Sequence, residues 1–253
     1  MLELWTSPTP NGWKVSIMIE ELIEAGIELP EVSVRTIDLS KGEQFEPDYT
    51  ERNLNQKIPV LKHNDRCIIE SGAILTYLGE TFPSALLPLD HRKWDVLPWV
   101  FWQAANLGPN FGNKLSYTRY LEDVPAIKKE HPLERFNNEA LRLVTVFDKK
   151  LGDKPYLCGE DFTIADIAAY PWLRGYKWSK IDVTTKPRIM AWLDRVRARP
   201  AVGRGLAYGA PKDQVDQWSK DRKSKYARIG ASMASNTAIL DSDAKLKDQE
   251  PDS

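Results

Sequence analysis

The chain has 253 residues, of which 42% are hydrophobic and 28% are charged. These proportions exclude a wholly disordered chain, a collagen-like fibre and a coiled coil. Thirty-five basic residues nearly balance 36 acidic ones, so no excess positive charge is left for a general nucleic-acid binder. The sequence has no long apolar run and no signal peptide at its start, which predicts a protein that does not enter a membrane.

Cysteine and histidine are too sparse for a metal site or a disulfide framework. Cys67 and Cys158 lie far apart in the sequence, which is typical of a protein from a reducing compartment. No two of the three histidines, His63, His91 and His131, have the spacing of a zinc-binding helix. We therefore expect a cytoplasmic protein without a bound metal.

The first forty residues have the pattern of a strand, a helix and a second strand. Residues 2–5 (LELW) are mostly apolar and are followed by two prolines and a glycine, as at the end of a strand. Apolar residues recur at helical spacing over 15–23, and Gly26 then marks a stop. Residues 32–39 alternate like a strand. Such a βαβ unit is normally right-handed, with parallel strands.

Two more short strands and a helix complete the first half. The segments 59–61 and 67–69 are separated by a turn over 63–66, and a helix begins at Ser71. The order βαβαββα is thioredoxin-like and predicts a mixed four-stranded sheet. We assign residues 1–82 to this α/β domain.

The second half has helical periodicity throughout. The segment 83–90 is proline-containing and aperiodic, so we interpret it as a linker. An all-helical, all-α domain is expected over 91–231, followed by a flexible tail over 232–253. Helix breaks are expected near Gly108–Pro109, Pro125, Pro132, 152–159, Pro187 and Pro200.

One helix start in this half is well marked. Thr163 stands at the N-cap position and Asp166 three residues later, which is a capping box with aspartate in place of the usual glutamate. Phe162 and Ile167 are spaced to form a hydrophobic staple. The role of this motif is structural, and loss of the Thr163 cap would cost about 1 kcal/mol.

The segment Thr9-Pro10-Asn11-Gly12 lies between the first strand and the first helix. Thioredoxin-like proteins often hold two cysteines here, but this chain has Thr9 and Gly12 in their places. A helix N-terminus still favours an anion, so a reactive sulfur would have to come from a ligand. The alternative is that Thr9 and Asn11 only cap the helix.

A helix N-terminus and one hydrogen bond can together stabilise the thiolate of a bound ligand. Lowering a thiol pKa by about two units requires roughly 2.7 kcal/mol. A helix dipole contributes about 0.3–1 kcal/mol, or about 2 when partly buried. One hydrogen bond to a charged acceptor adds about 1.5–3 kcal/mol. Together the two effects are sufficient.

Two other loops could contact a peptide-like ligand. A cis bond at Pro59 would turn the backbone groups of Ile58 outward, although an ordinary trans proline at a strand start is the alternative. The Ser71 hydroxyl and the free N–H groups beside it suit a carboxylate, and Glu70 suits an ammonium group. An α-amino acid end would fit both, whereas a plain helix cap is the alternative.

Five collinear segments resemble the glutathione transferase superfamily over about residues 2–208. They are TPNGWKVSI, KIPVL, ESGAILTYL, a proline-containing linker and GEDFTIADIAAYPW. The stretches FWQAANLGPNFG and LERFNNEA are similar to the nu class and its nitrogen-regulator-like relatives.

This resemblance implies a homodimer that binds glutathione in the thioredoxin-like domain, beside an apolar electrophile site. It implies that Thr9 and Asn11 contact the glutathione sulfur, with a serine-type role for Ser7 as the alternative. It further assigns Ile58 and a cis Pro59 to the cysteinyl unit, Glu70 and Ser71 to the γ-glutamyl end, Lys57 to the glycyl carboxylate, and Arg135 to a contact from the helical domain.

The implied activity is glutathione-dependent disulfide reduction, conjugation of soft electrophiles, or both, with modest peroxidase activity. The alternative is a non-catalytic glutathione-binding regulatory module. Regulators of this group would be expected to have an Asn- or Gln-rich N-terminal extension. This sequence starts directly at the first strand, so we expect an enzyme.

Overall fold

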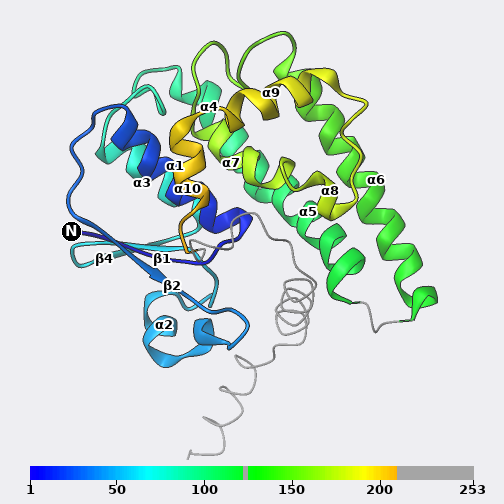
Figure 1. Ribbon diagram of the computed structural model, residues 1–253, viewed down its shortest axis with the longest axis horizontal. Coiled ribbons are helices and arrows are strands. Elements are labelled where there is room, and N and C mark those ends of the chain that lie inside the picture. The colour runs from blue at the N-terminus through cyan, green and yellow to red at the C-terminus, as the bar shows by residue number, and fades with distance from the viewer. Residues whose placement is uncertain (122–124, 210–253) are drawn as a thin grey trace, which may run out of the picture.

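The computed structural model describes residues 1–121 and 125–209. Its first part is a four-stranded sheet, and its second part is built from helices (Figure 1). The strands are β1 (Leu2–Thr6), β2 (Val32–Thr36), β3 (Val60–His63) and β4 (Arg66–Ile69).

The sheet has the mixed topology expected from the sequence. The strand order is β2-β1-β3-β4. β1 pairs in parallel with β2, and both β1–β3 and β3–β4 are antiparallel. The predicted second strand is shorter than expected and ends at Thr36 instead of Leu39.

Helices cover both faces of the sheet. Helices α1 (Pro10–Glu24) and α3 (Ser71–Thr81) lie on one side, and α2 (Pro47–Arg52), which follows the 3-10 turn η1 (Glu43–Phe45), lies on the other (Figure 1). The alternation of β1 explains this. Leu4 belongs to the large core shared with α1, whereas Trp5 packs with Tyr49 of α2.

The second part consists of helices joined by turns and loops. Its elements are α4 (Lys93–Trp102), the π-helical turn η2 (Gln103–Leu107), α5 (Gly108–Leu115), the π-helical turn η3 (Ser116–Tyr120), α6 (Ala126–Leu151), α7 (Ile164–Leu173), α8 (Tyr176–Ser179), α9 (Pro187–Arg197) and α10 (Pro200–Leu206).

Two of the predicted helix breaks are wrong. Gly108 has helical φ and ψ values, so the chain continues from α4 through η2 into α5. Pro109 falls at the start of α5, where a missing N–H costs little. Pro132 lies inside α6. The residue four positions before it, Lys128, is exposed, so solvent can satisfy the carbonyl that proline leaves unbonded.

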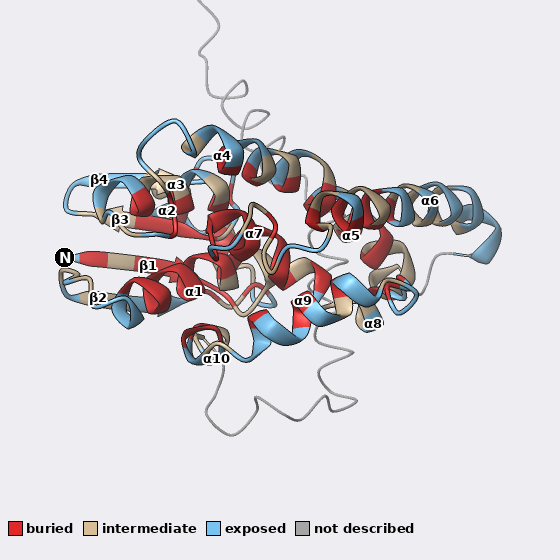
Figure 2. Ribbon diagram, turned by 90° about the horizontal axis from the view of Figure 1, so that it is seen from above, coloured by how far each residue is buried: buried red, intermediate tan, exposed pale blue. Residues whose placement is uncertain are grey.

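Helix α7 forms the centre of the helical part, and nine of its ten residues are buried (Figure 2). The predicted capping box is present: Thr163 caps the helix, and the Asp166 carboxylate accepts from the Thr163 backbone N–H at 3.1 Å. The carboxylate also accepts from the Leu157 N–H at 2.8 Å and from the Trp192 indole at 2.9 Å. It therefore ties α7 to α9 and to the preceding loop.

The end of the described chain returns to the first helix. The Ser16 hydroxyl donates to the Gly205 carbonyl at 2.7 Å, and a Cβ on Gly205 would stand 2.6 Å from the Ile17 Cα. Arg199 and Arg204 pair with Glu21 and Glu20 of α1 at 2.5 and 2.6 Å. These contacts hold α10 beside α1 (Figure 1) and join the two parts of the molecule.

None of the described helices is both long and apolar enough to cross a bilayer. Within residues 1–121 and 125–209, no cluster of His, Cys, Asp and Glu could hold a metal ion. The tail predicted over 232–253 and the last part of the predicted helical domain lie outside the described residues.

Candidate functional site

A cavity of about 1460 Å³ opens between the sheet part and the helical part. The sheet part contributes the start of α1 and the loops that precede β3 and α3, and the helical part contributes η2, α5, η3 and the region of α7 and α8. Seven of the eight residues predicted to bind the ligand line it: Thr9, Asn11, Lys57, Ile58, Pro59, Glu70 and Ser71.

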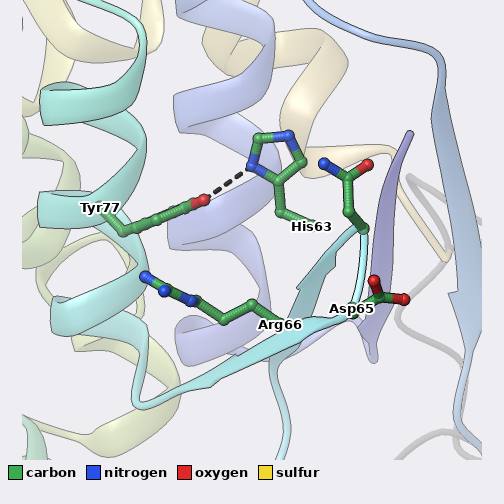
Figure 3. Close-up of a pocket in the computed structure, with 5 residues that line it drawn as sticks. His63, Asp65, Arg66 and Tyr77 are labelled. Carbon is green, nitrogen blue, oxygen red and sulfur yellow. Dashed lines mark hydrogen bonds between the residues drawn. The ribbon is translucent and has the colours of Figure 1, made fainter.

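A second, shallower hollow lies at the β3–β4 hairpin (Figure 3). Its five lining residues include His63 and Tyr77, whose Nδ1 and hydroxyl oxygen are 2.7 Å apart. These two groups therefore satisfy each other. No helix N-terminus faces this hollow, so the larger cavity is the better candidate for anion chemistry.

Thr9 is the N-cap of α1, and its Oγ1 accepts from the Gly12 N–H at 3.3 Å. Thr9 therefore does cap the helix, but capping uses only an acceptor site of its hydroxyl. A hydroxyl that accepts one bond keeps its own proton, so Thr9 can still donate into the cavity. Gly12 itself has no room for a side chain, because a Cβ would stand 2.2 Å from the Ser7 carbonyl oxygen.

Asn11 is held by a residue from the opposite side of the cavity. The Trp172 indole N–H, on α7, donates to Asn11 Oδ1 at 3.2 Å. An indole N–H can only donate, so the amide oxygen faces Trp172 and the amide NH₂ remains available to donate. Gly108 and Gly112 of α5 make room for the ring, since a Cβ on either would stand 3.3–3.4 Å from it.

The loop before β3 has the predicted cis bond between Ile58 and Pro59. The Lys57 carbonyl accepts from the Tyr49 hydroxyl at 2.9 Å and from Asn53 Nδ2 at 2.7 Å. These bonds anchor the loop to α2 and leave the Lys57 side chain exposed at the rim. Ile58 and Pro59 then form part of the cavity wall.

Glu70, immediately before α3, has a φ of 67°, a left-handed value that is rare outside glycine. Such conformations cost on the order of 1–3 kcal/mol and cluster at functional sites. Glu70 makes no cap bond with its side chain and is exposed, whereas Ser71 is buried. Glu70 thus presents a carboxylate beside the free N–H groups of α3.

Lys14 is a site residue that the sequence analysis missed. Its side chain is 2% exposed, and its Nζ donates to Ser71 Oγ at 3.1 Å and to Gln103 Oε1 at 2.5 Å. Burial lowers the Lys14 pKa to about 7, against the opposing charge of Glu70. Position 14 lies four residues before Met18 on the buried face of α1. The sequence contained a signal for this residue, because a lysine on the apolar face of a predicted helix is unusual.

Arg135 is the one predicted site residue that does not line the cavity. It is exposed on α6. There it contributes, after Arg142 and as a minor effect, to lowering the pKa of Glu139. Ser7, the alternative hydroxyl, does line the cavity and is buried, so it remains an alternative to Thr9.

Three buried glutamines leave polar atoms without partners at the cavity wall. Both side-chain polar atoms of Gln44, Oε1 of Gln56 and Nε2 of Gln103 lack hydrogen bonds within the described part of the chain. Buried polar groups are normally paired, so these atoms suit a ligand with several amide or carboxylate groups. The helical part adds an aromatic surface that includes Tyr117, Tyr120, Trp172 and Trp178.

The site contains side chains whose hydrogen-bond donors are directed by neighbouring groups. The N–H groups of Gly12 and Trp172 can only donate to Thr9 and Asn11, and protonated Lys14 likewise donates to Ser71, which leaves these three side chains able to donate into the cavity. The first two stand at the start of α1 and the third at the start of α3. The arrangement suits an elongated ligand with an anionic sulfur and an amino acid end.

A thioredoxin-like sheet joined to a helical part, with donors facing an aromatic wall, is the architecture of the glutathione transferases. The model of the "Glutathione S-transferase, N-terminal domain" matches residues 1–80, and that of the "Glutathione S-transferase, C-terminal domain" matches residues 100–200. The chain belongs to the glutathione S-transferase family.

Two similar proteins are named as disulfide-bond oxidoreductases. The "Disulfide-bond oxidoreductase YfcG" of Escherichia coli is 34% identical over 216 residues, which cover 81% of this chain and 94% of the relative. The "Disulfide-bond oxidoreductase YghU" of the same organism is 36% identical over 219 residues, which cover 81% of this chain and 73% of the relative.

Solved structures of glutathione transferases are also similar to this chain. A glutathione transferase family member from Pseudomonas fluorescens with two glutathione bound matches with a TM-score of 0.72 and 34% identity. The match covers 81% of this chain and 92% of that one. A Pseudomonas putida glutathione transferase with one glutathione disulfide per subunit matches with a TM-score of 0.73 and 29% identity, over 81% of this chain and 90% of that one.

Proposed function

We propose that this protein is an enzyme that binds glutathione in the interdomain cavity and uses its thiolate to reduce disulfide bonds, conjugate soft electrophiles, or both. The observation on which this rests is the pair of oriented donors at the start of α1, Thr9 and Asn11, in a site without a cysteine. The names of the relatives from Escherichia coli support disulfide reduction as the main reaction.

The tripeptide lies along the sheet side of the cavity. Its γ-glutamyl end takes the Glu70–Ser71 corner, its cysteinyl backbone pairs with Ile58 before Pro59, and its glycyl carboxylate extends toward Lys57. All five residues belong to the cavity wall. The unpaired amide of Gln44 and the unpaired Oε1 of Gln56 lie on the same wall and satisfy the remaining polar groups of the peptide.

The reaction needs no protein thiol. The bound glutathione thiolate attacks one sulfur of a disulfide and displaces the other as a thiolate, which takes a proton from water. A second glutathione thiolate then attacks the mixed disulfide, yielding oxidised glutathione and releasing the second substrate thiol. Cys67 and Cys158 do not line the cavity, and burial raises the Cys158 pKa to about 12.

Binding and turnover are tested together. We expect calorimetry to show association of both reduced and oxidised glutathione with the purified protein. We also expect faster turnover with a small mixed disulfide than with an aromatic halide. The absence of any heat of binding by folded protein would overturn the proposed function. Binding without turnover of either substrate would instead favour the regulatory module.

We also propose that the protein forms a homodimer through α4. Trp94 and Phe101 are each 69% exposed. They lie seven residues apart and thus on the same side of the helix. Large exposed aromatic side chains that share one face are typical of an interface.

Replacing both aromatic residues by serine is expected to convert a dimer into a monomer in sedimentation experiments. The control is Leu54→Ser, which alters a side chain that is 79% exposed on the loop after α2. This control variant should still sediment with the mass of a dimer. A native chain that sediments as a monomer at micromolar concentration would contradict the dimer.

Compartment and domain division are also proposals. Both cysteines are free, and Cys67 is exposed, in keeping with a cytoplasmic, reducing environment. The division into a thioredoxin-like domain over 1–82, a linker over 83–90 and a helical domain from 91 onward fits the positions of α3 and α4.

A further inference from the structure

Lys14 is a buried lysine whose Nζ contacts no carboxylate within the described part of the chain. Its Nζ has two neutral acceptors, Ser71 Oγ and Gln103 Oε1, and makes no ion pair with any described residue. Burying an ammonium group without an opposite charge is costly. A protein that retains such a group on the wall of a cavity has a place for a negative ligand group beside it.

The neighbours of Lys14 offer further donors to the same place. Gln103 is 1% exposed and uses its Oε1 to accept from Lys14, so its unpaired Nε2 is a donor at the cavity wall. A Cβ on Gly108 would stand 2.8 Å from this Nε2, so glycine preserves the space around the amide. Lys14, Ser71 and Gln103 together form a carboxylate-binding corner built from both parts of the molecule.

The protonation state of Lys14 determines whether Ser71 Oγ accepts a hydrogen bond from Lys14 or donates one to it. A charged ammonium group can only donate, so Ser71 Oγ accepts from it and directs its own proton elsewhere. A neutral amine has a lone pair and can accept the Ser71 proton instead. Loss of the Lys14 proton therefore removes both the positive charge and the orientation of the hydroxyl.

We infer that Lys14 is a positioning residue that takes up a proton when the α-carboxylate of the γ-glutamyl unit binds at Ser71, which links ligand affinity to pH. This inference rests on the proposed function, because it places glutathione at the Glu70–Ser71 corner. Lys14 acts on the ligand through Ser71 and through its charge.

Other charged groups around α1 are already engaged. On α3, Glu70 is the acid whose charge acts on Lys14. On α10, Arg199 and Arg204 pair with Glu21 and Glu20. On α7, Asp166 is bonded to Thr163, Leu157 and Trp192, and beyond that helix Arg174 lies over the Trp13 ring at 4.9 Å.

Lys14 is thus the group on this wall expected to titrate near neutrality. Its pKa of about 7 in the free protein contrasts with the ordinary lysine value of 10.5. None of the three histidines lines the cavity. A ligand carboxylate nearby raises the Lys14 pKa, so affinity is greatest below about pH 7 and declines as the pH rises above it.

S-methylglutathione is the appropriate probe because it has the same carboxylates but no ionisable thiol. We expect its Kd to increase about tenfold between about pH 6 and pH 8. We also expect calorimetry near pH 8, in two buffers of different ionisation enthalpy, to show uptake of close to one proton.

Three variants distinguish the effect of the positive charge at position 14 from the effect of its loss as the pH rises. Lys14→Met should bind at least about tenfold more weakly at pH 6, with little further change to pH 8, since the carboxylate loses its cation. Lys14→Arg keeps the charge at both pH values and should bind with a Kd that does not change with pH. Lys154→Met, an exposed lysine outside the cavity, should behave like the native chain.

The native titrations decide the inference even if a variant fails to fold. Binding of S-methylglutathione without proton uptake and without pH dependence would overturn the role of Lys14 and leave the proposed function standing. The same pH dependence in folded Lys14→Met would also overturn it, because the ligand's own amine would then be its source. No binding at any pH would overturn the proposed function and this inference with it.

Discussion

Replacing Thr9 and Asn11 together by alanine should lower kcat/KM for glutathione-dependent disulfide reduction by about 10²–10³-fold. Each side chain only accepts in its bond with Gly12 or Trp172, so the Thr9 hydroxyl and the Asn11 NH₂ remain as donors for the sulfur. A hydrogen bond to a charged acceptor contributes about 1.5–3 kcal/mol, which corresponds to about 10–10²-fold for each single variant. The double loss is smaller than the product, because the two donors share one sulfur.

The mechanism can be measured directly as the thiol pKa of bound glutathione, followed by the ultraviolet absorbance of the thiolate. We expect this pKa to rise in Thr9→Ala and Asn11→Ala, and to remain near the native value in Thr9→Ser, which keeps the hydroxyl and the cap. Full activity of the folded double variant would contradict the assignment and direct attention to Ser7, which lines the same cavity.

Trp172→Phe tests how Asn11 is oriented. Phenylalanine keeps an aromatic ring at this position but has no N–H to hold Asn11 Oδ1, and it lacks the indole atoms that face Gly108 and Gly112. The amide is then free to turn its oxygen toward the thiolate, which should raise the thiol pKa and lower kcat by about tenfold. An unchanged thiol pKa would show that the N–H of Trp172 does not orient Asn11.

The second large effect concerns stability. Asp166→Ala is expected to reduce the free energy of unfolding by about 3–5 kcal/mol. The carboxylate is fully buried and accepts bonds from the Leu157 N–H, the Trp192 indole, and the N–H and hydroxyl of Thr163. Alanine removes the acceptor and leaves these donors buried without partners, each at a cost of about 1–3 kcal/mol before relaxation.

Denaturant unfolding of two milder variants provides the comparison. Thr163→Ala removes the cap and one of the four bonds to the Asp166 carboxylate, and should cost about 1–2 kcal/mol. Asp166→Asn keeps the shape, but Oδ1 and Oδ2 each accept two bonds in the native chain. The amide NH₂ must therefore face two donors, and we expect an intermediate loss. A cost below 1 kcal/mol for Asp166→Ala would show that the carboxylate is not the centre of this network.

The local pattern of the chain was sufficient for most of the fold. Alternation in β1 places Leu4 and Trp5 on opposite faces of the sheet, and the two helix layers follow from it. The Thr163–Asp166 capping box was predictable because a capping motif involves only neighbours in sequence. The continuous helix through Gly108 was not, since packing against Trp172 and the π-helical turn η2 override the local preference of Gly-Pro.

The sequence by itself predicted a helix N-terminus without cysteine, and its resemblance to a family assigned Thr9, Asn11, Ile58 and Ser71 to one ligand site. All four residues line the cavity. Only the tertiary structure decided which ends of these side chains donate. The groups that orient them lie far away in sequence: Trp172 is 161 residues from Asn11, and Lys14 is 57 residues from Ser71. A sequence pattern reports which side of an element is buried, whereas the direction of a hydrogen bond depends on which group the fold brings opposite to it.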